Sequence, residues 1–156
     1  MKKIAVFPGS FDPITKGHES ILQRAIPLFD KIIVLLGENS DKKTMFSKEQ
    51  RIKWIEKTFA NFPNIEVASH SGLTVDFCKK VGADFILRGL RTSSDFEFER
   101  SIAQANKKLY PNIETIFILT LPEHTFITST IVRDIIRHNG DTKDFIPDAI
   151  EIKTNL

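Results

Sequence analysis

Cationic and hydroxyl side chains recur in four short segments of this sequence, and their types suit the binding of phosphate groups. The first segment, residues 8–18, contains a Pro-Gly turn, the hydroxyl of Ser10 and then Gly17-His18 at the start of a helical pattern. Free backbone N–H groups at a helix start favour an anion, and a histidine there can donate a hydrogen bond to a phosphate oxygen. Neither the Gly-x-Gly-x-x-Gly fingerprint nor the Walker lysine loop is present in this segment. The segment therefore indicates a phosphate site that uses neither of these two motifs. The alternative interpretation is a simple turn before a helix.

Three later segments add groups of the same kind. Lys42 and Lys43 lie in a polar stretch after an apolar run, where a lysine could act as a point charge for phosphate or simply be solvated. Residues 88–91, Arg-Gly-Leu-Arg, place two guanidinium groups around a glycine. Guanidinium forks bind phosphate oxygens in pairs, although arginine pairs are also common on surfaces. Residues 128–130, Thr-Ser-Thr, precede a helical pattern and predict an N-cap, a cradle for a polyphosphate, or both.

Other charged pairs give weaker signals. Arg133 and Arg137 lie four residues apart, hence on one helix face, and could add charge near the site; the alternative is a solvated face paired with Asp134. Glu97 and Glu99 are two residues apart, which places them on different faces of a helix and disfavours a catalytic dyad.

The elements that must position these groups are five short apolar runs and the helical segments between them. The runs are rich in Ile, Val, Leu and Phe and are bounded by turn residues; they span residues 4–7, 32–36, 65–68, 85–87 and 115–119. Continuous apolarity is typical of strands buried on both faces in a parallel sheet. The alternation predicts an α/β, Rossmann-like single domain over residues 1–156, with a five-stranded parallel sheet and helices on both faces. Ligands of such sheets bind beyond the carboxyl ends of the strands, which is where the four segments fall.

Local signals predict where the earlier helices begin and end. Pro27 should end or kink the first helix early. Ser47 and Gln50 have the spacing of a capping box at the start of the second helix. Gly82 suits a left-handed C-cap after a short helix over residues 75–81.

The later helices are predicted in the same way. A helix over residues 95–110 places four apolar side chains on one face: Phe98, Ile102, Ala105 and Leu109. The last long helix should stop at Asn139 and Gly140, and Pro147 is expected to open a small terminal helix.

Composition excludes several classes of protein. With 22 Lys and Arg against 20 Asp and Glu, the formal charge is +2, so no overall basic field points to a nucleic acid or a membrane surface. The single cysteine, Cys78, excludes an intrachain disulfide, fits a cytoplasmic location and has no evident base nearby in sequence, so we expect it to be structural. The 13 Phe are expected to be mostly core. Cations for an anionic ligand must therefore be concentrated locally.

Five motifs in this order closely resemble the bacterial phosphopantetheine adenylyltransferase family of the nucleotidyltransferase superfamily. They lie at residues 8–18, 42–46, 88–91, 95–99 and 126–130, and the likeness extends over nearly the whole chain. One motif alone would indicate only the superfamily, whereas five in this spacing are specific. The resemblance implies transfer of AMP from ATP to 4'-phosphopantetheine, giving dephospho-coenzyme A and pyrophosphate, by in-line attack without a covalent intermediate.

The same resemblance implies roles for individual residues. His18, Lys42 and Arg91 would be catalytic. The implied ATP site consists of Ser10, Phe11, His18, Gly89, Leu90, Arg91, Glu99, His124, Thr125, Phe126, Ile127, Thr128, Ser129 and Thr130. The implied acceptor site consists of Ser10, Lys42, Thr74 and Arg88.

The resemblance also implies Mg²⁺ held mainly through the ATP phosphates rather than by a metal site of side chains, a homohexamer, and coenzyme A as a feedback ligand at the same cleft. Neither a nucleic acid nor a membrane is an expected partner. Two alternatives remain: a nucleotidyltransferase of the same fold that acts on nicotinamide mononucleotide or uses CTP, and a nucleotide-binding module without turnover. The second is disfavoured because His18, Lys42, Arg88 and Arg91 together supply more cationic donors than docking adenine requires.

Overall fold

Strands whose side chains are apolar on both faces form the centre of the structure, a parallel five-stranded sheet in the order β3-β2-β1-β4-β5. The computed structural model describes residues 1–39, 41 and 43–153. The strands are β1 (Ile4–Gly9), β2 (Lys31–Glu38), β3 (Ile65–Ser71), β4 (Phe85–Leu90) and β5 (Glu114–Leu119). All five predicted strands are confirmed, and each of the first four continues two or more residues past its apolar run. The winding reverses between β1 and β4, so the predicted ligand edge lies where these two strands end.

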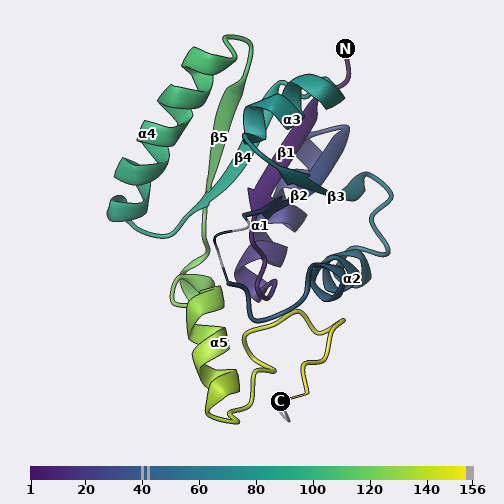
Figure 1. Ribbon diagram of the computed structural model, residues 1–156, viewed down its shortest axis with the longest axis vertical. Helices are drawn as coiled ribbons and strands as arrows, with labels where there is room; N and C mark the ends of the chain where they lie inside the picture. Colours follow the sequence, from purple (N-terminus) through teal and green to yellow (C-terminus); the bar gives the residue numbers. More distant parts are fainter. Residues whose placement is uncertain (40, 42, 154–156) are drawn as a thin grey trace.

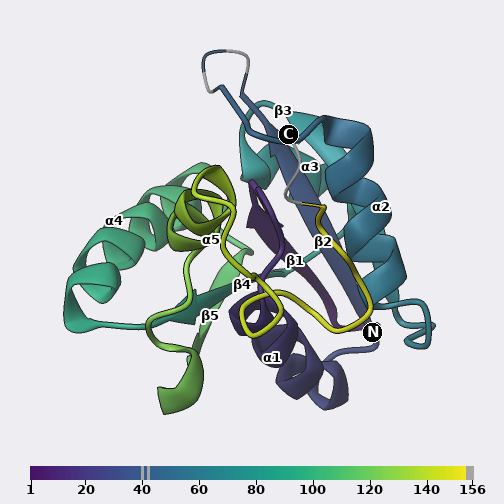
Figure 2. The same cartoon turned by 90° about the horizontal axis from the view of Figure 1, so that it is seen from below.

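Helices cover both faces of this sheet, as predicted (Figure 1). They are α1 (Lys16–Ala25), α2 (Lys48–Thr58), α3 (Thr74–Val81), α4 (Ser93–Leu109) and α5 (Ser129–Arg137), with 3₁₀ turns η1 (Ile26–Leu28) and η2 (Pro122–His124). One core joins the sheet to buried side chains of α1, α2, α5 and the C-terminal tail. A second core on the opposite face joins the sheet to α3. Figure 2 shows α5 and the tail lying beside the start of α1, at the end of the molecule where β1 runs into its loop.

The early helix boundaries follow their local signals. The α-helix α1 ends at Ala25, and Pro27 lies in the 3₁₀ turn that follows, as predicted. The Ser47 hydroxyl caps α2 by accepting from the Gln50 N–H at 3.2 Å, which is one half of the predicted capping box. Gly82 adopts the left-handed C-cap conformation, with φ at +67°. These ends depend on interactions within one helical turn, which is why the sequence alone predicts them.

The predicted terminal helix at Pro147 is wrong. The chain makes a turn there, in which the Ile150 N–H donates to the Pro147 carbonyl at 3.1 Å. Ile146, Ile150 and Ile152 are buried in the core that includes α1. Burial of these side chains along an extended tail outweighs the weak helix-start signal of one proline.

Helix α4 forms close to its predicted bounds, but its apolar face is largely open to solvent. Phe98 is 68% exposed, Leu109 51% and Ile102 39%. Phe96 and Phe126 are also exposed. The expectation that most Phe residues are core therefore holds for the sheet and fails along α4 and the segment before α5.

Candidate functional site

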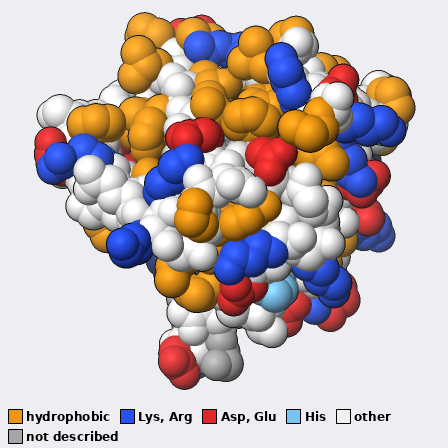
Figure 3. Space-filling view, turned by 90° about the horizontal axis from the view of Figure 1, so that it is seen from above, with side chains coloured by type: hydrophobic (Ala, Val, Ile, Leu, Met, Phe, Trp, Pro, Cys, Tyr) orange, Lys and Arg blue, Asp and Glu red, His pale blue; other side chains and the backbone are white. Residues whose placement is uncertain are grey.

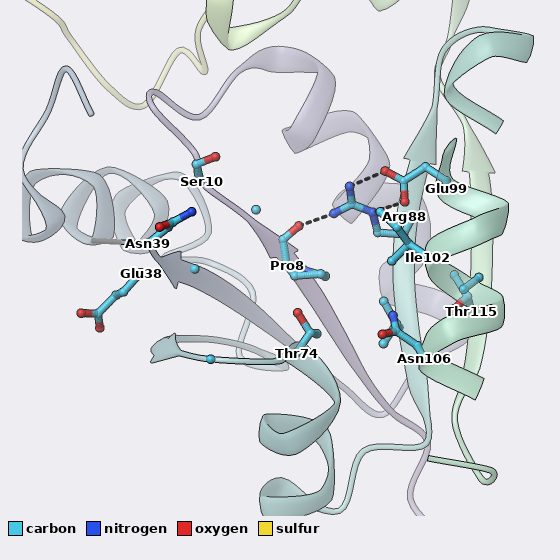
Figure 4. Close-up of a pocket in the computed structure, with 15 residues that line it drawn as sticks. Pro8, Ser10, Glu38, Asn39, Thr74, Arg88, Glu99, Ile102, Asn106 and Thr115 are labelled. Atoms are coloured by element: carbon cyan, nitrogen blue, oxygen red, sulfur yellow. Dashed lines mark hydrogen bonds and ion pairs between the residues drawn. The ribbon is translucent and has the colours of Figure 1, made fainter. Parts of the chain in front are cut away.

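Two adjoining cavities open at the carboxyl ends of β1 and β4. The larger has a volume of about 520 Å³ and the smaller about 360 Å³. Both are lined by the same five residues, which we call the shared wall: Pro8, Gly9, Ser10, Arg88 and Glu99. Figure 4 shows the smaller cavity, with Arg88 and Glu99 on one side and Glu38 and Asn39 on the other. Two ligands bound in these cavities would therefore meet at the end of β1.

His18 lies in the larger cavity and is oriented by the start of its own helix. Its backbone N–H donates to the Thr15 hydroxyl at 3.4 Å, and its ring Nδ1 accepts from the Thr15 N–H at 3.1 Å. The Thr15 hydroxyl also lies 3.0 Å from Nδ1. Because Nδ1 serves as the acceptor, the ring proton of a neutral imidazole resides on Nε2, which leaves an N–H donor for a ligand. This reciprocal capping box was not predicted, since the usual pattern has Glu or Gln in place of the histidine.

The charge of His18 differs from the expectation that it is one of four cationic donors. Removal of the ring from water is the main cause that lowers the pKa of His18 to about 4, and the charges of Arg88 and Arg91 lower it further. The imidazole is therefore neutral at pH 7. It can donate one hydrogen bond but adds no positive charge to the site.

The loop after β1 holds an aromatic ring against this histidine. Phe11 is 2% exposed, and its ring centroid lies 5.1 Å from that of His18. Its backbone is in the left-handed region, with φ at +47°. A Cβ atom at Gly9 would lie 2.9 Å from the Phe11 ring, so residue 9 must be glycine for the ring to occupy this place. Phe11 thus supports the floor of the larger cavity.

Arg88 and Arg91 both reach the larger cavity, but each already has acidic partners. Arg88 donates to both carboxylate oxygens of Glu99, from Nε at 2.8 Å and from Nη2 at 2.6 Å, and its Nη1 donates to the Pro8 carbonyl at 2.7 Å. Arg91 lies 3.3 Å from the Asp95 carboxylate and is more exposed. A guanidinium has five N–H groups, so Arg88 keeps two for a ligand.

The N-terminus of α5 forms another side of the larger cavity. The Thr128 hydroxyl accepts from the Ile131 N–H at 3.1 Å, which confirms the predicted N-cap. The Ser129 hydroxyl donates to the Pro13 carbonyl at 2.8 Å and so ties α5 to the loop after β1. The helix start therefore presents backbone N–H groups to the cavity in a fixed position.

Arg133 lines the larger cavity from α5, whereas Arg137 one turn later is exposed. The alternative interpretation, a solvated pair with Asp134, is wrong for Arg133. Its Nη1 donates to the Asp12 carbonyl at 2.8 Å and its Nη2 to the Thr130 hydroxyl at 3.1 Å. The four-residue spacing placed both arginines on one face of α5. It could not show that only the first turn of this face borders the cavity.

Two buried charged residues in the loop framework were missed by sequence reasoning. The Asp12 carboxylate accepts from the Met45 and Phe46 N–H groups at 2.8 and 3.0 Å. Arg51, 6% exposed, donates to the Ser10 carbonyl at 2.7 Å. Together they join the loop after β1 to the segment before α2. The only available signal was an arginine within the amphipathic pattern of α2.

The predicted ATP residues divide into two groups. Ten line the larger cavity: Ser10, Phe11, His18, Gly89, Arg91, Glu99, Ile127, Thr128, Ser129 and Thr130. Four line neither cavity: Leu90, His124, Thr125 and Phe126. The Leu90 side chain is buried, and Phe126 is 58% exposed. For all of them, contact with a nucleotide stays a prediction.

The predicted acceptor residues Ser10, Thr74 and Arg88 line the smaller cavity. Lys42 lies outside the described residues. Beyond the shared wall, the lining combines apolar side chains, namely Ile86, Ile102 and Ala103, with polar ones, among them Glu38, Thr74 and Asn106. A ligand with an anionic head at the wall and a long uncharged arm would match this lining.

Other reactive or metal-binding groups are scarce. Burial raises the pKa of the Cys78 thiol to about 11, so the thiol stays protonated at pH 7, in keeping with a structural role. Among residues 1–39, 41 and 43–153, no three His, Cys, Asp or Glu side chains gather closely enough to hold a metal ion. Within the same part of the chain, no helix is both long enough and apolar enough to cross a membrane.

Comparisons with known proteins agree with this geometry. A family model described as cytidylyltransferase-like matches residues 6–135. The phosphopantetheine adenylyltransferase of Flavobacterium psychrophilum is 55% identical to this chain, covering 96% of it and 98% of that protein. The enzyme of the same name from Flavobacterium johnsoniae is 54% identical over 96% of this chain and 97% of that protein.

A solved structure shows the same fold at low identity. The bifunctional NMN adenylyltransferase/ADP ribose pyrophosphatase from Francisella tularensis superimposes with a TM-score of 0.74 and 18% identity. The superposition covers 96% of this chain and 46% of that one.

The family match over residues 6–135, together with the parallel sheet and its reversal point between β1 and β4, makes this chain a cytidylyltransferase-like nucleotidyltransferase. Within that class, the sequence identity of more than half over nearly the whole length of both relatives decides the family. The chain belongs to the phosphopantetheine adenylyltransferase family.

Proposed function

We propose that this protein transfers the AMP group of ATP to 4'-phosphopantetheine, forming dephospho-coenzyme A and pyrophosphate. Family membership supports the reaction. The observation that carries the proposal is the pair of cavities with one shared wall, because a transfer between two substrates requires both to be bound side by side.

ATP is assigned to the larger cavity. Its lining brings together donors from three parts of the chain: His18 of α1, Arg91 after β4, and Arg133 with the N-terminus of α5. Helix N-termini and arginines suit a triphosphate. Arg133 is on α5 and lines only the larger cavity, which favours a role at the phosphates that leave rather than at the acceptor.

The acceptor is assigned to the smaller cavity. Arg88 has two N–H groups left for its phosphate, and the apolar side chains of Ile86 and Ile102 suit the pantetheine arm. The Asn106 amide lies along the same cavity and could bond to an amide of that arm. Lys42 is proposed to contribute charge at the same phosphate, as its sequence motif implies.

The reaction needs alignment and charge stabilisation rather than a protein base. An oxygen of the acceptor phosphate forms a bond to the α-phosphorus, and the bond from that phosphorus to the bridging oxygen breaks, with its electron pair leaving on pyrophosphate. A phosphate monoester is already anionic at neutral pH, so no proton has to be removed first. The neutral His18 donates its Nε2–H to an α-phosphate oxygen, where negative charge is held in the transition state.

Magnesium is proposed to enter with ATP. The larger cavity offers hydroxyls and a neutral imidazole, while its carboxylates Asp95 and Glu99 are paired with arginines. Such a donor set fits an ion held chiefly by phosphate oxygens and water. When bound, the ion would neutralise charge on the phosphates.

We also propose a homohexamer, coenzyme A as a feedback ligand and a cytoplasmic location. The exposed apolar residues of α4, with Leu119 of β5 at 70% exposure, favour burial against other copies of the chain. On the face drawn in Figure 3, apolar side chains gather over the upper half, and basic and acidic side chains lie between and below them without a field of one sign. Coenzyme A contains the same phosphopantetheine arm and would compete for the smaller cavity. The lone buried thiol of Cys78 fits a reducing compartment.

The deciding experiment measures pyrophosphate release from ATP with three acceptors offered in turn: 4'-phosphopantetheine, nicotinamide mononucleotide and glycerol phosphate. Turnover only with the first supports the proposal. Turnover with another acceptor and none with the first would reject it, and no turnover with any would favour a binding module. Light scattering on the purified chain tests the hexamer.

A further inference from the structure

We propose that Glu99 is a positioning residue for Arg88, and that its carboxylate serves the acceptor phosphate rather than the phosphates of ATP. The inference rests on the proposed function, because it takes Arg88 as a ligand of the acceptor phosphate. It departs from the role that the sequence motif implies for Glu99, which is contact with ATP.

The geometry of the pair carries the inference. Glu99 is 8% exposed and lies on α4, while Arg88 lies on β4. Both carboxylate oxygens accept from the guanidinium, at 2.6 and 2.8 Å, as the dashed lines in Figure 4 show. Two parallel hydrogen bonds fix the orientation of the guanidinium plane as well as its distance from the carboxylate.

A third bond fixes the remaining freedom of the arginine. Nη1 of Arg88 donates to the Pro8 carbonyl at 2.7 Å, so the guanidinium is held between α4 and the end of β1. An unrestrained arginine side chain has several rotatable bonds, and ordering it on binding costs free energy. With Glu99 and Pro8 in place, that ordering is complete before the acceptor arrives, and two N–H groups remain for its phosphate.

Charge argues against direct contact between Glu99 and a triphosphate. A carboxylate only accepts hydrogen bonds, and phosphate oxygens at neutral pH also only accept. Glu99 borders both cavities, so an unpaired carboxylate there would repel the phosphates of either substrate. Pairing with Arg88 removes that net charge from the shared wall.

The test compares Glu99→Gln with a matched control, Glu97→Gln. Glu97 is two residues away on the same helix, its side chain is 66% exposed, and it pairs with Arg100. We expect Glu99→Gln to raise KM for 4'-phosphopantetheine about tenfold, the equivalent of one lost oriented bond. KM for ATP should stay within about twofold, and Glu97→Gln should change neither value.

A double-variant cycle separates positioning from general structural damage. In an Arg88→Ala background, adding Glu99→Gln should raise KM for 4'-phosphopantetheine no further, because the group that Glu99 positions is already absent. Additive losses would overturn the inference, as would a selective rise in KM for ATP. A fall in KM for the acceptor would also overturn it, since Glu99 would then act only by reducing the charge of Arg88.

Two further controls keep the result interpretable. Thermal unfolding of each variant shows whether it is folded. If Glu99→Gln does not fold, Glu99→Asp takes its place, because it keeps the negative charge but moves the carboxylate away from Arg88 by the length of one methylene. The same outcomes are then expected. Wild-type protein that fails to use 4'-phosphopantetheine would reject the proposed function. Wild-type turnover with an unchanged acceptor KM in the variants would reject this inference alone.

Discussion

Protonation of His18 should destabilise the folded protein in mildly acidic solution. Its pKa falls from an ordinary 6.5 to about 4 on folding, so between these values the unfolded chain binds a proton that the folded chain does not. The stabilising effect of the neutral ring is complete above about pH 6.5, is lost as the pH falls, and stops changing below about pH 4. From pH 7 to pH 5 the loss worked from these two pKa values is at most about 2 kcal/mol.

The assay is urea unfolding at closely spaced pH values for the wild type and for His18→Gln, which keeps an N–H donor but does not titrate. Other groups titrate in both proteins, so the difference between the two curves isolates His18. That difference should change by about 1–2 kcal/mol across the interval, with the wild type losing stability toward pH 5. A flat difference curve, or an NMR titration of the His18 ring near pH 6.5, would refute the reasoning. Turnover should likewise show no step near pH 6.5 that depends on His18.

Three other substitutions test separate parts of the site. Arg133→Met should lower kcat/KM for ATP by roughly 10- to 100-fold in steady-state kinetics, because it removes the donor proposed to bind the leaving phosphates. The exposed Arg137 provides the control, and Arg137→Met should change kcat/KM little. Equal effects of the two substitutions would contradict the role assigned to Arg133. Gly9→Ala should cost about 1–3 kcal/mol in urea unfolding, since its Cβ would lie 2.9 Å from the Phe11 ring, and unchanged stability would show that the ring can move at no cost. Lys42→Ala should raise KM for 4'-phosphopantetheine in the same assay, and an unaltered value would remove Lys42 from the acceptor site.

The sheet and the helix ends could be predicted because they depend on neighbours in sequence. Runs of apolar residues marked every strand, and caps such as Gly82 act within a single turn. The edge at which the two cavities open followed from the parallel topology alone. The same reasoning failed at Pro147, where the isoleucines on either side of it are buried against a core formed by segments distant in sequence.

Partners and charge states in the site could not be predicted, because they depend on contacts between segments far apart in sequence. Arg88 and the Pro8 carbonyl are 80 residues apart, and Arg133 and the Asp12 carbonyl are 121 apart. The neutrality of His18 depends on the removal of its ring from water and on two arginines at the end of β4. Residue types and spacing therefore located the groups, but only the fold shows which of them are already paired.

The shared wall restricts how this protein can change under selection. Three of its five positions are the consecutive residues 8–10, and at Gly9 even one added methyl group meets the Phe11 ring. A substitution there that excludes an inhibitor from one cavity would also alter the other, so resistance would carry a loss of fitness. A compound that spans both cavities and contacts this backbone would consequently leave few routes of escape through mutation.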